Sequence, residues 1–288
     1  MRPPIRLIAG PTASGKTALA LQWARESGAV IINADSQQLY RDLRILTARP
    51  SEAEEALAEH RLFGVADAAD AWSVGRWVRA VTPILDELRA EGRPAVVVGG
   101  TGLYFRALTQ GLADIPPAPT EVRDAAGDRF DREGEAAFRE ALAAVDAEAE
   151  ARIAPGDRQR LVRAMSVHMA TGRPLSRWRA ETRPLLPRQD FEAVVIEPDR
   201  DLLYARCDAR LDAMVEAGVL EEVRALAARR LDPELPAMKA TGLREFMACL
   251  RGELSLAQAL EAAKRETRRY AKRQLTWFRN QTPDWPRV

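Results

Sequence analysis

An octapeptide near the beginning of the chain has the spacing of a phosphate-binding loop. Residues 10–17 read GPTASGKT and satisfy the pattern G-x-x-x-x-G-K-[ST] at each required position. The apolar run Ile5–Ala9 precedes the octapeptide and a helical pattern over 18–26 follows it, which is the setting that the pattern requires. The sequence therefore predicts a site for a polyphosphate and disfavours the alternative, a glycine-rich turn that binds nothing. The predicted loop consists of Gly10, Pro11, Thr12, Ala13, Ser14, Gly15, Lys16 and Thr17.

Each part of this loop has a chemical role to play. Backbone amides at a helix N-terminus form a nest for anions, and Lys16 adds a full positive charge. The Thr17 hydroxyl can coordinate Mg²⁺. We expect Lys16 to be an exposed loop residue, whose replacement would change the stability of the fold little.

Polar residues follow two further apolar runs. Val30–Asn33 is followed by Asp35, and the run 95–98 is followed by Gly99-Gly100-Thr101. Parallel strands end at the same edge of a sheet, so Asp35 and Thr101 should lie beside the loop. Three roles remain open for Asp35: a Mg²⁺ ligand, a general base near the phosphates, or the N-cap of a following helix.

These runs belong to a regular alternation along the chain. The apolar runs are Ile5–Ala9, Val30–Asn33, 95–98 and 191–196, and helical segments lie between them. Such alternation is typical of an α/β fold with helices on both faces of a parallel sheet. With the phosphate loop, it predicts a P-loop NTPase-like sheet.

A long stretch without a strand pattern separates the third and fourth runs. Prolines mark its beginning at 116–119 and its end at 184 and 187, and three segments within it have helical patterns: 122–132, 133–145 and 157–171. We expect a helical insertion over 113–188. It would divide the α/β core into 1–112 and 189–288, the second part ending in basic helices.

The composition is typical of a soluble globular protein. Of 288 residues, 47% are hydrophobic and 30% are charged. No apolar run has the length of a membrane span, and the first strand begins too early for a signal peptide. Cys207 and Cys249 form no C-x-x-C pair, and His60 and His168 lack zinc-ligand spacing. We therefore expect a reduced, cytoplasmic protein without a membrane contact or zinc site.

Basic residues gather near the end of the chain. The segment 264–279 contains seven of them and one acid, Glu266. On a helix, Lys264, Arg268 and Lys272 would form one ridge of like charges, which costs helix stability unless a phosphate-rich partner relieves the repulsion. Two interpretations stay open: an RNA surface on which aromatic side chains stack, or a solvated helix face.

Seven segments together resemble the tRNA dimethylallyltransferase family. Their order and spacing match the family over nearly the whole chain, which makes the combination specific. Departures from the family pattern occur at Gln37, Leu39, 59–61 and Leu243, and leave the contacts of those side chains open. The matching segments are GPTASGKT (10–17), INADSQQLY (32–40), TARP (47–50), VGGTGLYFRAL (98–108), DRQRLVR (157–163), KATGLRE (239–245) and RQLTWFR (273–279).

The resemblance implies an alkyl transfer. The N6 amine of the adenosine just 3′ of a tRNA anticodon would attack C1 of dimethylallyl diphosphate, and diphosphate would leave. Asp35 would accept the proton of the amine, and Thr101 would position a reactant. Lys16, the loop amides, Arg210 and a Mg²⁺ ion on Thr17 would stabilise the leaving group.

The resemblance also implies contact with the anticodon stem-loop of tRNA, and we expect the protein to work as a monomer. A target base inside that loop must be flipped out to be reached. From the resemblance and the basic ridge together, the residues expected to contact RNA are Asp35, Ser36, Gln37, Gln38, Thr101, Arg123, Gln159, Arg160, Leu161, Arg163, Lys239, Arg268 and Lys272.

Two other functions share part of these features. A small-molecule or nucleotide kinase would have the same sheet, loop and helical insertion, but the basic C-terminal helix argues against it. An NTP-gated RNA-binding protein would have the loop and the basic helix without any transfer reaction. The family resemblance argues against both.

Overall fold

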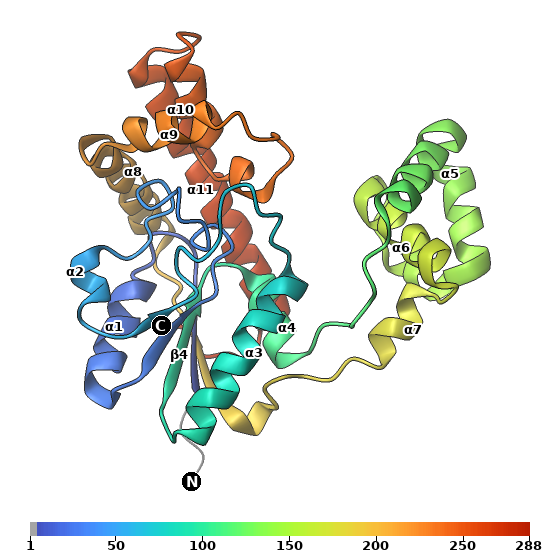
Figure 1. Ribbon diagram of the computed structural model, residues 1–288, viewed down its shortest axis with the longest axis horizontal. Helices are drawn as coiled ribbons and strands as arrows, with labels where there is room; N and C mark the ends of the chain where they lie inside the picture. Colours follow the sequence, from blue (N-terminus) through green and yellow to red (C-terminus); the bar gives the residue numbers. More distant parts are fainter. Residues whose placement is uncertain (1–4) are drawn as a thin grey trace. The chain divides into compact units, whose positions relative to one another are not determined.

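The computed structural model describes residues 5–288, and its centre is a five-stranded parallel sheet (Figure 1). The strand order is β3-β2-β4-β1-β5. The four predicted runs are confirmed as strands, and the fifth strand, β3, was not predicted, because it is a two-residue edge strand of polar residues. The strands are β1 (Ile5–Ala9), β2 (Val30–Asn33), β3 (His60–Arg61), β4 (Ala95–Gly99) and β5 (Phe191–Val195).

Helices cover both faces of the sheet, as predicted. On one face, Ile8 and Val96 pack against Ala20 and Leu21 of the helix that follows the phosphate loop. On the other face lies a second core that includes Leu7 and residues of α3, α4 and α11; Figure 1 shows α1 and α3 on opposite sides of β4. The helices of this part of the chain are α1 (Lys16–Ser27), α2 (Glu52–Glu55), α3 (Val74–Ala90), α4 (Gly102–Thr109), α8 (Arg200–Glu216), α9 (Val219–Ala228), α10 (Leu243–Leu250) and α11 (Leu256–Gln281), with short 3₁₀ helices η1 (Arg188–Asp190) and η2 (Pro236–Lys239).

The described chain forms two compact units. One comprises the residues up to Thr109 together with Leu185–Val288, and the other is Gln110–Pro184, against the expected insertion of 113–188. The second unit consists of α5 (Thr120–Arg152), α6 (Arg158–Thr171) and α7 (Leu175–Ala180) around its own core. Helix α7 was not predicted from the sequence.

The long helix α5 is broken at two places. Gly134 has a φ of 77°, which only glycine adopts without strain, and this is where the predicted helices 122–132 and 133–145 meet. The second break is at Asp146, a buried residue whose carboxylate accepts hydrogen bonds from the backbone amides of Ala149 and Ser176. These bonds hold the third segment of α5 and the start of α7 in place.

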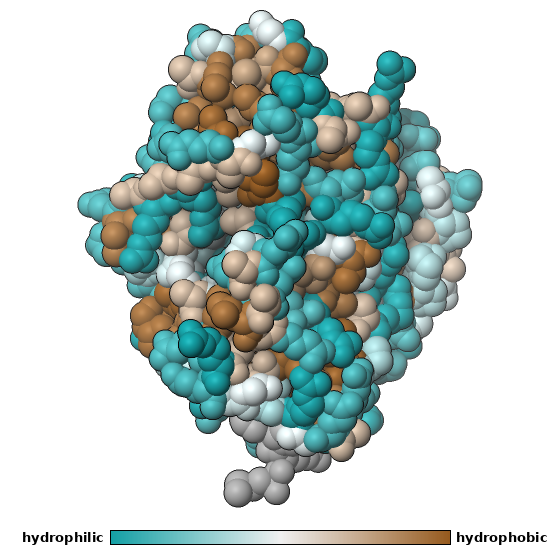
Figure 2. All heavy atoms as spheres, turned by 60° about the vertical axis from the view of Figure 1, so that its left-hand side comes forward, coloured by the Kyte–Doolittle hydropathy of each residue, from teal (hydrophilic) through white to brown (hydrophobic). Residues whose placement is uncertain are grey.

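No helix within residues 5–288 is both long and apolar enough to cross a membrane. On the face in Figure 2, hydrophilic side chains predominate, and the apolar ones lie between them in small groups.

Candidate active site

The phosphate loop joins β1 to α1 with the backbone of an anion nest. Ala13 and Gly15 both have positive φ angles, 62° and 96°, which turn successive amides toward one side. The loop is closed internally, because the Ser14 amide donates to the Pro11 carbonyl (3.4 Å) and Lys16 Nζ donates to the same oxygen (3.1 Å). The buried Ser14 hydroxyl has no partner among the described residues and remains available to a ligand.

Lys16 is buried, contrary to the expectation from sequence, and only 8% of it is exposed. Burial lowers the pKa of Lys16 to about 8; the nearby Asp35 carboxylate opposes this shift, and the Arg210 guanidinium adds to it. A buried ammonium group with one carbonyl partner is poorly solvated. An anionic ligand would therefore restore the charge balance at this point.

Arg210 reaches the loop from α8, as expected. Its Nη1 donates to Thr12 Oγ1 (3.1 Å), across nearly 200 positions of sequence. Burial is also the main cause that lowers the pKa of Arg210. The structure thus brings two desolvated cations, Lys16 and Arg210, to one end of the loop.

Asp35 lies at the carboxyl end of β2, and 9% of it is exposed. No helix begins after it within residues 36–50, so the interpretation of Asp35 as a helix N-cap is wrong. Its Oδ1 instead accepts the Gln37 amide (3.0 Å), and the Asn33 side chain brackets its backbone by accepting from the Asp35 amide (2.7 Å) and donating to the Asp35 carbonyl (3.0 Å). Its other oxygen, Oδ2, lies close to Gly100.

Thr101 ties the third predicted segment to the second. Its amide donates to the Ala34 carbonyl (3.2 Å), and its Oγ1 accepts the Ser36 amide (2.9 Å). The same hydroxyl lies 3.2 Å from Ser36 Oγ. Loop, Asp35 and Thr101 therefore meet at one sheet edge, as the parallel topology requires.

Two tyrosines lie near Asp35, and the sequence did not associate either of them with it. Burial raises the pKa of Tyr104, on α4, and of Tyr270, on α11, and the Asp35 carboxylate raises both further. Tyr104 stacks on Trp77 with ring centroids 4.2 Å apart, and the Trp77 indole donates to the Asn33 carbonyl (2.9 Å). No sequence motif joins these residues, because they come from separate elements.

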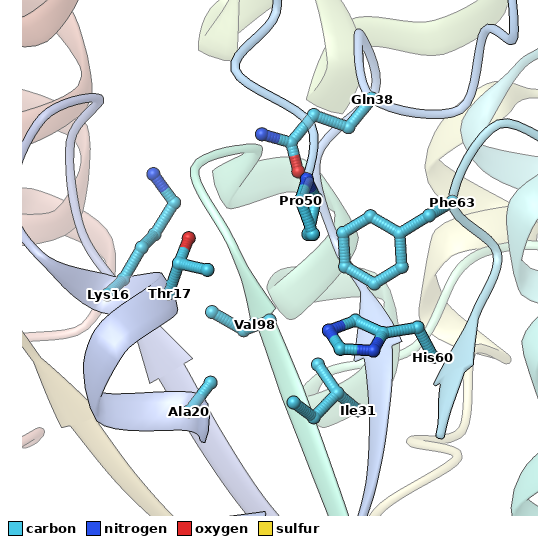
Figure 3. A pocket seen from close by; sticks show the side chains of 9 residues that line it. All are labelled: Lys16, Thr17, Ala20, Ile31, Gln38, Pro50, His60, Phe63 and Val98. Carbon is cyan, nitrogen blue, oxygen red and sulfur yellow. The ribbon is translucent and has the colours of Figure 1, made fainter. Parts of the chain in front are cut away.

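A small pocket lies beside Lys16 and Thr17 (Figure 3). Its volume of about 10 Å³ is comparable to the space for one water molecule, so it does not accommodate an isoprenoid tail. Within residues 5–288, no group of three or more His, Cys, Asp or Glu side chains is placed to hold a metal ion. The pocket is lined by Lys16, Thr17, Ala20, Ile31, Gln38, Pro50, His60, Phe63 and Val98.

The glutamines after Asp35 are engaged in the fold. Gln38 Nε2 donates to the carbonyls of Thr47 (2.9 Å) and Ala48 (3.0 Å), and so holds the loop that carries the TARP segment. Gln37 Oε1 is buried without a partner among the described residues. Gln38 therefore supports its loop, whereas Gln37 keeps an unused acceptor.

The second unit brings several of the predicted RNA contacts together. Gln159, Arg160 and Arg163 are exposed on α6, and Arg123 on α5 is close enough to Arg163 that its charge, after burial, lowers the pKa of Arg163. Leu161 has no exposed surface and belongs to the core of this unit, so its side chain cannot contact RNA. The prediction that the Leu161 side chain contacts RNA is therefore wrong.

The basic ridge on α11 is partly neutralised by acids that the sequence pattern did not associate with it. Arg268 donates twice to the carboxylate of Asp208 on α8 (2.6 and 2.5 Å), and Lys264 pairs with Asp212 (2.7 Å). Lys272 is exposed and has no ion-pair partner among residues 5–288. It borders a hollow of about 530 Å³ at the C-terminal half of α11, lined by Arg269, Lys272, Arg273, Thr276, Trp277, Asn280 and Gln281.

Lys239 is the remaining predicted RNA contact of the first unit. It lies at the end of η2, is exposed, and pairs with Glu234 at 2.9 Å. An exposed pair of this kind is weak, so the ammonium group stays available to phosphate.

Family models match most of the chain. The model described as IPP transferase matches residues 38–281, and the one described as Isopentenyl transferase matches residues 3–65. A tRNA dimethylallyltransferase of Caulobacter sp. (strain K31) is 61% identical over 99% of this chain and 92% of its own length. One of Phenylobacterium zucineum (strain HLK1) is 63% identical over 100% of this chain and 93% of its own length.

Solved structures agree with these matches. The full-length tRNA isopentenylpyrophosphate transferase from Bacillus halodurans has a TM-score of 0.68 and 32% identity, covering 99% of this chain and 89% of its own. A eukaryotic dimethylallyltransferase, described as acting on tRNA, has a TM-score of 0.83 and 25% identity, covering 96% of this chain and 70% of its own.

Proposed function

Because the chain belongs to the tRNA dimethylallyltransferase family, we propose that the site at this sheet edge transfers a dimethylallyl group from dimethylallyl diphosphate to a tRNA. The acceptor is N6 of the adenosine 3′-adjacent to the anticodon, and diphosphate is released. The observation that carries the proposal is the position of the desolvated Lys16 near the Asp35 carboxylate, whose charge raises the pKa of Lys16. An anion-binding site and a proton acceptor thus lie side by side.

The diphosphate binds in the loop. Amides of the nest, Lys16 and Arg210 neutralise its charge, and that charge grows on the leaving oxygen as the C–O bond breaks. Ser14 Oγ, which lacks a partner within residues 5–288, donates to a phosphate oxygen. The resulting stabilisation is largest in the transition state, which is where it accelerates the reaction.

Asp35 acts as the general base. The N6 lone pair is delocalised into the adenine ring, so the amine becomes nucleophilic only as its proton is taken up. As the C–N bond forms at C1, the C–O electrons leave with diphosphate and the N6 proton moves to Asp35. Thr101, held by the Ser36 amide, orients the amine or the diphosphate beside it.

Mg²⁺ fits this site as a cofactor. Thr17 lies beside Lys16 at the start of α1 (Figure 3), and a single protein hydroxyl suits an ion that keeps several waters and takes its other ligands from phosphates. When bound, Mg²⁺ would neutralise diphosphate charge.

The RNA surface has two parts in this proposal. One comprises Arg123, Gln159, Arg160 and Arg163 of the insertion, and the other comprises Lys239, Arg268 and Lys272 of the first unit. Ser36, Gln37 and Gln38 contact the flipped base region near Asp35. The substrate being tRNA, the protein acts in the cytoplasm, and we propose that it does so as a monomer.

Mass spectrometry of an unmodified tRNA tests the function. The tRNA is incubated with the protein, Mg²⁺ and dimethylallyl diphosphate, and a single adenosine next to the anticodon should gain the mass of one dimethylallyl group in place of a hydrogen. Parallel reactions with ATP test the alternatives. Phosphoryl transfer at an enzyme-like rate would support a kinase, and ATP-dependent RNA binding without product would support a gated binding protein.

A further inference from the structure

A buried glutamine of α11 lies between the two halves of the site. Gln274 is only 6% exposed, in a position where an unpaired amide would be costly. Both ends of its carboxamide are paired: Oε1 accepts the Thr12 amide (2.9 Å), and Nε2 donates to the Gly100 carbonyl (2.9 Å). The two partners are 262 and 174 positions away along the chain.

The partners of Gln274 belong to opposite sides of the proposed reaction. Thr12 is part of the phosphate loop, and its hydroxyl accepts from Arg210. Gly100 precedes Thr101, which is bonded to Ser36 next to Asp35. Gln274 therefore connects the phosphate loop, which would hold the diphosphate, to the segment that carries Thr101 beside Asp35, which would face the amine.

The fit around this connection is tight. A β-carbon on Gly100 would lie 2.2 Å from Gln274 Nε2 and 3.3 Å from both Asp35 Oδ2 and the Gly10 carbonyl oxygen. Only glycine lets the carboxamide approach the strand end so closely. The two hydrogen bonds of Gln274 therefore fix the distance between the phosphate loop and the end of β4.

We propose that Gln274 is a positioning residue for the transfer reaction, setting the distance between the phosphate loop and the Asp35–Thr101 segment. This inference rests on the proposed function. Because Thr12 donates its amide to Gln274, the diphosphate is held by the other amides of the loop. In-line displacement requires the reacting atoms to be about 3–3.5 Å apart, and a shift of about 1 Å costs on the order of 100-fold in rate.

Gln274→Met tests the proposal, because methionine has a similar length but makes neither hydrogen bond. We expect kcat to fall about 10- to 100-fold and KM for dimethylallyl diphosphate to rise. The Kd for tRNA, measured without dimethylallyl diphosphate, should not change. Gln22→Met is the matched control, because Gln22 is exposed on α1 and bonds only Glu26 among the described residues; its kinetics should equal those of the unmodified protein.

A double-mutant cycle separates positioning from general destabilisation. In Gly100→Ala, the added methyl group pushes the Gln274 carboxamide away from the end of β4. The kcat of the double variant with Gln274→Met should therefore be little lower than that of the slower single variant. If the fold-losses in kcat of the two single variants multiply in the double variant, the inference is overturned. A Gln274→Met protein with a lower melting temperature but unchanged kcat and KM would also overturn it. If Gln274→Met does not fold, Gln274→Glu, which keeps the acceptor for Thr12, is measured for the same kinetic changes.

The unmodified protein in the same assay distinguishes the two proposals. If it produces no modified tRNA, the proposed function fails. If it produces modified tRNA and Gln274→Met does so equally well, only the role of Gln274 fails.

Discussion

Replacing Lys16 with methionine should make the empty protein more stable while removing its ability to bind diphosphate. Lys16 is 8% exposed, and its pKa is lowered from 10.5 to about 8, chiefly because burial disfavours the charged form. A difference of about 2.5 pKa units corresponds to about 3 kcal/mol at about 1.4 kcal/mol per unit. Loss of the hydrogen bond to the Pro11 carbonyl offsets about 1 kcal/mol of this.

The direction in which stability changes with pH follows from the number of protons that each state binds. The unfolded chain holds the Lys16 proton up to its ordinary pKa, whereas the folded protein releases it near pH 8. The free energy of unfolding of the unliganded protein therefore rises with pH between about 8 and 10.5, and the full penalty is present below pH 8. At pH 7, the free energy of unfolding of Lys16→Met should exceed that of the unmodified protein by about 2 kcal/mol, which corresponds to roughly 5 °C in melting temperature for a chain of this size.

Thermal unfolding of both proteins at pH 7, 8, 9 and 10 measures the effect. The advantage of Lys16→Met should shrink as pH rises, and inorganic diphosphate should raise the melting temperature of the unmodified protein only. Lys272→Met is the control, because Lys272 is exposed and should show no such dependence on pH. A melting temperature at pH 7 equal to or below that of the unmodified protein would refute the reasoning, as would a difference independent of pH.

Three further predictions concern the base, the RNA surface and the insertion. Asp35→Asn should lower the single-turnover rate by about two to four orders of magnitude with little change in tRNA affinity, and a near-normal rate would leave Asp35 only its turn-forming bond to Gln37. Lys272→Gln should flatten the slope of log affinity for tRNA against log salt by up to about one unit, whereas Arg268→Gln should change it less, because Arg268 already pairs with Asp208; equal slopes in both variants would contradict this ranking. Asp146→Ala should lower the free energy of unfolding by about 2–4 kcal/mol in denaturant titration, because two buried backbone amides lose their acceptor, and a loss below about 1 kcal/mol would contradict that role.

Much of the fold was predictable because its determinants are local. The phosphate loop is one contiguous octapeptide between a strand and a helix, and the four apolar runs are continuous enough to indicate buried strands. Strand β3 and helix α7 escaped prediction because two polar residues and six residues respectively leave no periodic pattern.

The meeting of Lys16, Asp35 and Thr101 also followed from the sequence, because parallel strands place their carboxyl ends at one edge. The helix that was allowed for after Asp35 does not exist, because Asp35 Oδ1 accepts a hydrogen bond from the Gln37 backbone amide and Gln38 Nε2 donates to the Thr47 carbonyl. Asp and Gln side chains can form local hydrogen bonds with the backbone both at a helix N-terminus and in a non-helical turn. Contacts with other segments therefore decide which of the two forms after Asp35.

The sequence by itself determined which chemical groups this protein has and which sheet edge receives them. Only the tertiary structure decided their electrostatic state and their spacing. Lys16 is desolvated because other segments cover it, Arg268 is neutralised by an aspartate 60 positions earlier, and Gln274 reaches the loop across 262 positions. Desolvation and hydrogen-bond geometry depend on all atoms that surround a group, and those atoms come from parts of the chain that no local pattern relates to one another.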